Sequence, residues 1–150
     1  MKQTKIILVL GLVAILSADF AVEANDRKFR NEMAGTYEGT ARFNIFGGSI
    51  SERAIVKLPS RRGPIIVNVV NSNVDVKIRG NINKVRCRRK VITYEGRLRV
   101  SEGPLSVSGN FRAKARLRGN RKQLTLPISL SRRVLGRRLK VTGSYKGEQS

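Results

Sequence analysis

Arginine is the residue that could carry chemistry in this sequence, because the usual catalytic and metal-binding residues are almost absent. The 150 residues include no histidine and a single cysteine, Cys87. Histidine is the most common general base near neutral pH, and zinc sites use histidine or cysteine ligands. The composition therefore excludes a Ser-His-Asp triad, a Cys-His pair and a thiolate or imidazole zinc site.

The acidic residues offer no obvious pair for carboxylate catalysis. The candidates are Glu38, Asp75, Glu95 and Glu102. All four fall at polar strand positions or in turns, where we expect surface charges that pair with nearby arginines. No spacing singles out a Ser-Lys nucleophile, and no glycine-rich loop lies between a strand and a helix as nucleotide sites require. We therefore expect no enzymatic activity, no metal and no cofactor.

Basic side chains recur at every second position along several stretches of the chain. The sequence has 31 Lys and Arg against 10 Asp and Glu, a net charge of +21 at pH 7. Alternate residues of a strand point to the same face of a sheet, so each stretch would present a row of cations. The candidate anion-binding residues are Arg86, Arg88, Arg97, Arg99, Arg112, Lys114, Arg116 and Arg118. Comparable pairs are Lys77 with Arg79, and Arg138 with Lys140.

Such rows should repel one another unless an anion covers them. Same-face residues lie ~7 Å apart along a strand and neighbouring strands ~4.8 Å apart, inside the ~8 Å screening length of physiological salt. The planar guanidinium group suits phosphate, sulfate and carboxylate. Tryptophan is absent, and the few aromatic residues fall on the apolar face, so we do not expect bases to be stacked or nucleic-acid sequence to be recognised.

We therefore predict binding to an anionic polymer or surface. Envelope polysaccharide, anionic lipid head groups and extracellular nucleic acid would all provide the charge. A generally basic proteome, or charge used for solubility, would explain the same composition without any ligand. A structural role in the cell envelope, without any ligand, is another interpretation. The sequence does not indicate an oligomeric state.

The first residues have the composition of a secretory signal. Two lysines precede an apolar run at residues 6–16, which is too short to span a bilayer. Val22 and Ala24 put small residues before a cleavage site at Asn25, with Ala18 as a weaker alternative. We expect an exported protein, periplasmic or extracellular, that does not span a membrane. Loss of the signal would remove two basic and two acidic residues and leave the net charge unchanged.

Alternation of apolar and polar residues runs through most of the remaining chain and is typical of half-buried strands. Strands are expected at residues 36–45, 49–58, 65–70, 74–82, 85–93 with a continuation to 100, 105–117, 123–130 and 138–146. Gly, Pro and Asn turns separate them. Eight or nine short strands predict an all-β antiparallel domain, with an up-and-down barrel favoured over a two-sheet sandwich because closure removes exposed edges.

The expected organisation is a signal peptide at 1–24, a flexible arm at 25–34, a β domain at 35–147 and a tail at 148–150. The arm should hold at most one helical turn. The strand at 105–117 is long enough to require a bend or bulge, which we place at Gly109. Pro127 should lie at an edge or bulge because it lacks an amide donor. Cys87 is expected to be a buried small hydrophobe rather than a reactive thiol.

A short motif recurs in the chain. Thr36-Tyr37-Glu38-Gly39 returns as Thr93-Tyr94-Glu95-Gly96, and Ser144-Tyr145-Lys146-Gly147 resembles both. Duplication of a four-strand unit or chance would explain it. In each copy we expect the tyrosine ring in the core, with its hydroxyl reaching water or a backbone carbonyl.

A barrel could also carry an apolar ligand or span a membrane. Small residues with the inward parity could leave a cavity for an apolar ligand or allow close packing. They are Ala41, Ala54, Gly109, Ala113 and Ala115. A membrane-spanning barrel is disfavoured, because arginine-rich faces would have to line a narrow lumen and aromatic girdles are missing.

Overall fold

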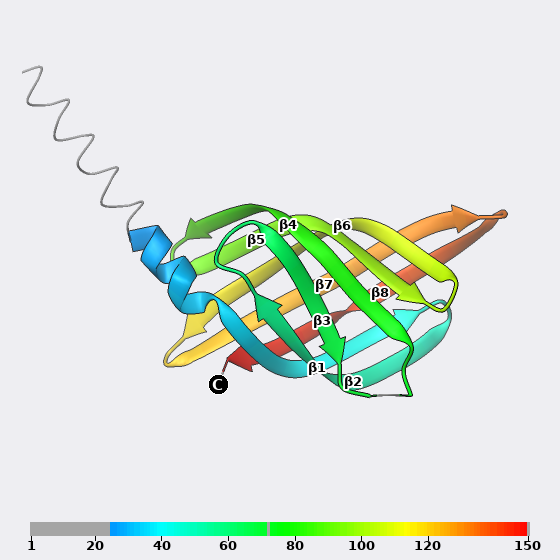
Figure 1. The fold of residues 1–150 in the computed structure, drawn as a ribbon, viewed down its shortest axis with the longest axis horizontal. Helices are drawn as coiled ribbons and strands as arrows, with labels where there is room; N and C mark the ends of the chain where they lie inside the picture. Colours follow the sequence, from blue (N-terminus) through cyan, green and yellow to red (C-terminus); the bar gives the residue numbers. More distant parts are fainter. Residues whose placement is uncertain (1–24, 72, 150) are drawn as a thin grey trace, which may run out of the picture.

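The protein is a closed antiparallel barrel of eight strands, seen in a computed structural model that describes residues 25–71 and 73–149 (Figure 1). Each strand pairs with its neighbour in sequence, and β8 closes the barrel on β1. The strands are β1 (Gly35–Ile45), β2 (Gly48–Leu58), β3 (Gly63–Val69), β4 (Val76–Arg88), β5 (Val91–Glu102), β6 (Leu105–Arg118), β7 (Arg121–Val134) and β8 (Arg137–Gln149). The prediction of an up-and-down barrel is confirmed. The predicted signal peptide lies outside the described residues.

Alternating side chains give the barrel an apolar interior and a polar exterior. Among the residues that the structure describes, every fully buried side chain is hydrophobic, and the buried set draws on all eight strands. Charged side chains alternate with them on the outside, so arginine does not line a lumen. This is the reverse of a membrane-spanning barrel, whose outer band is apolar. No helix within the described part of the chain is long and apolar enough to cross a bilayer.

The strand boundaries depart from the sequence pattern in the middle of the chain. β4 continues through the irregular region to Arg88, and a register shift between Ile82 and Lys84 absorbs one extra residue. Of the bend or bulge predicted at Gly109, the bulge is wrong, because β6 pairs with β5 without a shift. A bend at Gly109 stays a prediction. β8 also extends to Gln149, beyond the expected start of the tail.

The hydrogen-bonded ladder between β6 and β7 is short for strands of this length. It joins Lys114–Arg118 to Arg121–Thr125. Pro127, which has no amide hydrogen to donate, lies just beyond the last of these pairs. The barrel is closed, so Pro127 marks an interruption of the ladder and not the free edge that the sequence predicted. The two strands remain neighbours past this point, since a Cβ on Gly109 would lie 2.7 Å from Leu130 Cδ2.

A helix over residues 25–33 replaces the flexible arm expected there, and it is longer than the single turn that the sequence predicted. Its last residue, Met33, is fully buried in the barrel core, and Phe29 packs against the same core. Lys122 Nζ donates to Glu32 O at 2.8 Å and Gln149 Nε2 to Ala34 O at 3.2 Å. A helix this short is stabilised mainly by such tertiary contacts. Its own sequence therefore shows no long amphipathic pattern from which it could be predicted.

All three tyrosines are completely buried near the helix, as the recurring motif predicted. Tyr37 Oη donates to Met33 O at 2.6 Å, and Tyr145 Oη donates to Tyr37 O at 3.0 Å. These bonds tie β1 to the helix and β8 to β1. Tyr94 Oη is buried without a hydrogen-bond partner among the described residues.

Because Tyr94 lacks a hydrogen-bond partner, removal of its hydroxyl should affect stability differently from removal of the other two. Tyr37→Phe and Tyr145→Phe should each lower the free energy of unfolding by about 1 kcal/mol, because a buried hydrogen bond is lost. Tyr94→Phe should be neutral or stabilising, because it removes a buried polar group that has no partner. Urea denaturation of the three variants measures these changes. A Tyr94→Phe variant less stable than the other two would contradict the assignment.

The two complete motif copies occupy matching places in the barrel, on β1 and on β5. In each copy the glutamate pairs with an arginine of the following strand: Glu38 with Arg53, and Glu95 with Arg112 at 3.0 Å. Each glycine lies against a backbone carbonyl of the preceding strand, so close that a Cβ on Gly39 or Gly96 would overlap it. The motif therefore has one structural role repeated four strands apart, while common descent of the two halves stays a prediction.

Candidate anion-binding surface

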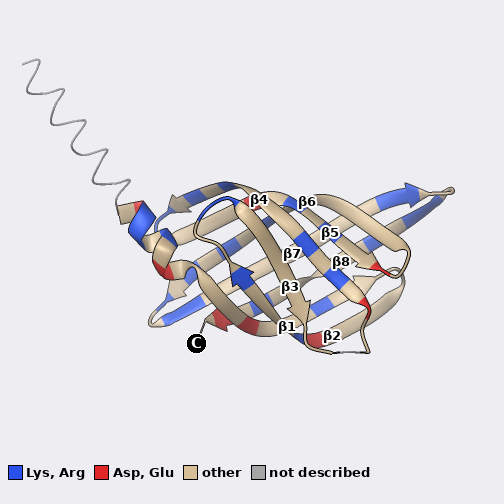
Figure 2. Cartoon of the chain, in the orientation of Figure 1, with Lys and Arg blue, Asp and Glu red and all other residues tan. Residues whose placement is uncertain are grey.

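All eight predicted anion-binding residues are exposed on the outer wall of β4, β5 and β6. Figure 2 shows basic residues spread over the strands, with acidic residues fewer and scattered. Strand pairing brings some of the eight together and separates others. The result is two hollows and an isolated pair rather than one continuous field.

The first hollow gathers four of the predicted residues over the ends of β4, β5 and β6. It has a volume of about 470 Å³. Its lining consists of Arg86, Arg88, Arg89, Val91, Thr93, Glu95, Arg112 and Lys114. Arg89 was missed by the sequence reasoning, although the basic run at residues 88–90 was visible as an interruption of the alternation. It lies in the tight turn between β4 and β5 with a φ of 51°.

Arg97 and Arg99 stand apart from this hollow, nearer the other end of β5. Arg97 is paired across the sheet with Asn81 and Asn110. Arg99 lies directly opposite Arg79, and its Nη2 donates to Ser106 Oγ at 3.2 Å. These two predicted residues therefore belong to a different part of the wall.

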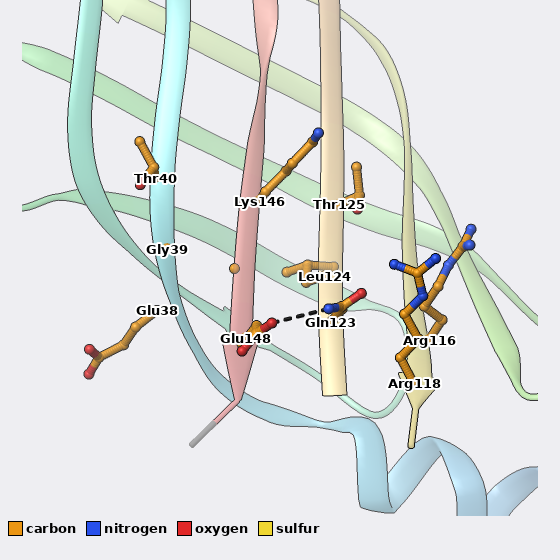
Figure 3. Close-up of a pocket in the computed structure, with 11 residues that line it drawn as sticks. Glu38, Gly39, Thr40, Arg116, Arg118, Gln123, Leu124, Thr125, Lys146 and Glu148 are labelled. Carbon is orange, nitrogen blue, oxygen red and sulfur yellow. Dashed lines mark hydrogen bonds between the residues drawn. The ribbon is translucent and has the colours of Figure 1, made fainter. Parts of the chain in front are cut away.

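Arg116 and Arg118 line a second hollow of about 690 Å³ on the outer face of β6, β7, β8 and β1 (Figure 3). Gln123 and Glu148 lie between the two arginines and Glu38, and Gln123 Nε2 donates to Glu148 Oε1 at 3.1 Å (Figure 3). Two carboxylates share this hollow with three cations, counting Lys146. Its charge is mixed, so the first hollow is the more cationic of the two.

Cross-strand register places a line of basic residues and threonines around the wall, which we name the cation–threonine belt. Its members, in order from β4 through β5, β6, β7, β8 and β1 to β2, are Arg86, Thr93, Lys114, Thr125, Lys146, Thr40 and Arg53. Each residue lies opposite the next. A threonine hydroxyl can also donate to an anion, so every position in the belt offers a donor.

The belt reduces the repulsion between basic residues that the sequence predicted. Its cations are two strands apart, roughly 10 Å, close to the ~8 Å screening length at physiological salt. Repulsion across the strands is therefore weaker here than the predicted side-by-side rows would give. Register decides this alternation, which is why the sequence did not show it.

Few of the cations have an acidic partner. Across residues 25–71 and 73–149, the ion pairs are Arg53 with Glu38 and Arg112 with Glu95. They confirm that these two carboxylates are surface charges paired with arginine. Arg86, Lys114 and Lys146 form no ion pair within the same residues, so their charge remains open to a ligand.

Cys87 adds no reactive group to this surface. It is half-buried and packs against the core next to the N-terminal helix. Burial raises the pKa of its thiol, and the nearby Asp26 carboxylate raises it further. A raised pKa lowers the fraction of the reactive thiolate.

The acidic residues do not cluster in the way a metal ion requires. Among the described residues no three Asp, Glu, Cys or His side chains lie close enough to hold one. The cation–threonine belt itself presents only basic side chains and hydroxyl groups, which are donors to anions. No protein-family model, curated protein or solved structure matches this chain.

Proposed function

We propose that this is an exported protein that binds anionic polymers or surfaces through the outer wall of its barrel. The observation that carries the proposal is the cation–threonine belt, where Arg86, Lys114 and Lys146 lie in one line without acidic partners. Each cation has a threonine on the neighbouring strand, so a phosphate, sulfate or carboxylate group could accept bonds from both.

The course of the belt favours a flexible polymer. It follows the circumference from β4 to β2, so a ligand must curve to reach all of its cations. A single acidic polysaccharide chain can bend on this scale, whereas duplex DNA is too stiff to do so without a large cost. Binding of this kind depends on charge and spacing, with no reading of nucleotide bases.

Close packing is the better explanation for the small inward residues that suggested a ligand carrier. The alanines at 41, 54, 113 and 115 are completely buried, and Leu130 occupies the space beside Gly109. The helix with Met33 packs against one end of the barrel. Nothing in the described part of the chain favours a cavity for an apolar ligand.

Retention on a heparin column tests the proposal. The protein should bind at low salt, and a belt variant with Arg86→Ser, Lys114→Ser and Lys146→Ser should elute at lower salt. Loss of three contacts should reduce the slope of log affinity against log salt by about 2, at ~0.7 per contact. All three side chains are exposed, so the fold should persist, which circular dichroism checks.

A matched control removes the same charge elsewhere on the molecule. Lys57, Arg61 and Arg62 are exposed on and after β2, outside the belt. Their replacement by serine should reduce retention less than the belt variant does. Equal losses in the two variants would mean that diffuse charge, and not the belt, binds the polymer. A wild-type protein that fails to bind at low salt would refute polyanion binding altogether.

A further inference from the structure

The ends of β7 and β8 extend beyond the barrel as a two-stranded ribbon, which we name the β7–β8 arm (residues 131–140). Their mutual pairing continues to Val134 and Arg137, whereas the ladder of β7 with β6 ends at Thr125 and that of β8 with β1 begins at Val141. A bond from Phe46 N to Lys140 O, 3.3 Å, holds the base of the arm. Figure 1 shows the ribbon projecting past the other strands.

The tip of the arm carries an unfavourable residue for its turn. Leu135 and Gly136 form the two-residue turn with φ values of 51° and 77°. Two consecutive positive φ angles define a type I′ turn, which favours Asn-Gly because most side chains are strained there. The Leu135 side chain is also 99% exposed. The residue therefore carries both backbone strain and exposed apolar surface, a combination that points to a function at this position.

Basic residues surround this apolar tip on both strands of the arm. They are Arg132, Arg133, Arg137, Arg138 and Lys140, all exposed. No acidic residue lies between 131 and 140, and none of these cations forms an ion pair with another described residue. Figure 2 shows the basic residues on both strands close to the tip.

We propose that the β7–β8 arm docks on an anionic phospholipid bilayer, with Leu135 inserted among the acyl chains and the arginines on the phosphates. A soluble polyanion would satisfy the arginines but gain nothing from an exposed leucine. An anionic bilayer supplies both parts, since negative head groups attract basic residues and the layer below accepts an apolar side chain. The surface is separate from the cation–threonine belt, so this inference does not rest on the proposed function.

The first experiment measures sedimentation with phosphatidylcholine vesicles, with and without phosphatidylglycerol. The protein should bind only the anionic vesicles. Leu135→Asn should weaken that binding by about tenfold or more, since burial of one leucine side chain is lost. Asparagine suits the type I′ turn, so this variant should be at least as stable to heat as the wild type. An unchanged affinity would overturn the proposal.

Leu117→Asn is the matched control, because Leu117 is 37% exposed and pairs with Lys122 at the start of β7, whereas the arm lies at the other end of that strand. It should leave vesicle binding unchanged. An equal loss from this variant would overturn the proposal by showing that leucine content, and not the tip, matters. The belt variant separates the two functions: it should elute from heparin at lower salt than the wild type and keep vesicle binding that depends on Leu135. Vesicle binding that depends on the belt and not on Leu135 would also overturn the arm as the docking element.

A fluorescent reporter tests insertion directly. The chain has no tryptophan, so Leu135→Trp introduces a single probe at the tip. Its emission should shift to the blue with anionic vesicles and be quenched by brominated acyl chains, and heparin should produce neither change. Emission that stays at the wavelength of an exposed indole would show that the tip does not enter the bilayer.

Discussion

Gly96→Ala is expected to destabilise the barrel by about 3 kcal/mol or more, the upper range for overpacking. A Cβ at this position would overlap the carbonyl oxygen of Asn81 and lie 3.0 Å from Ile82 Cα, both in the backbone of β4. A flexible side chain could move aside, but here the strand itself must shift. Gly39 in the other motif copy meets the backbone of β8 in the same way, so Gly39→Ala should have a similar effect.

Thermal unfolding followed by circular dichroism measures the loss, with Gly48→Ala as the control. Gly48 begins β2, and a Cβ there would lie 3.5 Å from Ile45 O, an ordinary contact. The control should therefore melt close to the wild type. If Gly96→Ala melts as the control does, the close approach of β4 and β5 at this point is wrong.

Alkali is expected to unfold the barrel and to ionise its three tyrosines in the same transition. Burial raises the pKa of Tyr37 from 10 to about 12, and it raises the pKa values of Tyr94 and Tyr145 still further. In the unfolded chain these phenols would ionise near pH 10. The barrel holds them neutral, so the folded state keeps protons that the unfolded state loses.

Proton linkage sets the direction in which the stability of the barrel changes with pH. The stability that these phenols contribute is fully present below pH 10 and falls as the pH rises toward 12 and beyond. Each phenol should cost about 1.4 kcal/mol of stability per pH unit in this range, or about 4 kcal/mol per unit for the three. Deprotonation of lysines over the same range relieves charge repulsion and acts in the opposite direction.

Near-ultraviolet phenolate absorbance and far-ultraviolet circular dichroism, recorded on the same samples, test this expectation. The chain has no other tyrosine, so the absorbance reports on these three alone. The two signals should change together, at a pH above 10. Phenolate absorbance that rises near pH 10 while the dichroism of the strands is unchanged would show that the tyrosines are accessible in the folded protein.

The recurring motif shows how far local sequence can predict this structure. Alternation placed Tyr37 and Tyr94 inside and Glu38 and Glu95 outside, and the barrel confirms all four. Their exact partners were not predictable. Arg53 and Arg112 lie on the following strands, and only strand pairing selects them from the many arginines of the chain.

Two elements escaped prediction because their causes lie outside their own segments. The helix at residues 25–33 is stabilised by its packing on the barrel end, and its sequence has no extended amphipathic pattern. The register shift lies between Ile82 and Lys84, where β5 carries Gly96, and not at Gly109 in β6.

The sequence by itself determined which side chains face the core and which face outward, because the direction of a side chain in a strand depends only on local parity. It therefore predicted the barrel, its apolar interior and its basic exterior. Tertiary structure decided which basic residues meet, because register is a relation between strands and a slip of one residue would reverse every side chain. The cation–threonine belt, the separation of Arg97 and Arg99 from the other predicted residues, and the projection of Leu135 all depend on that register.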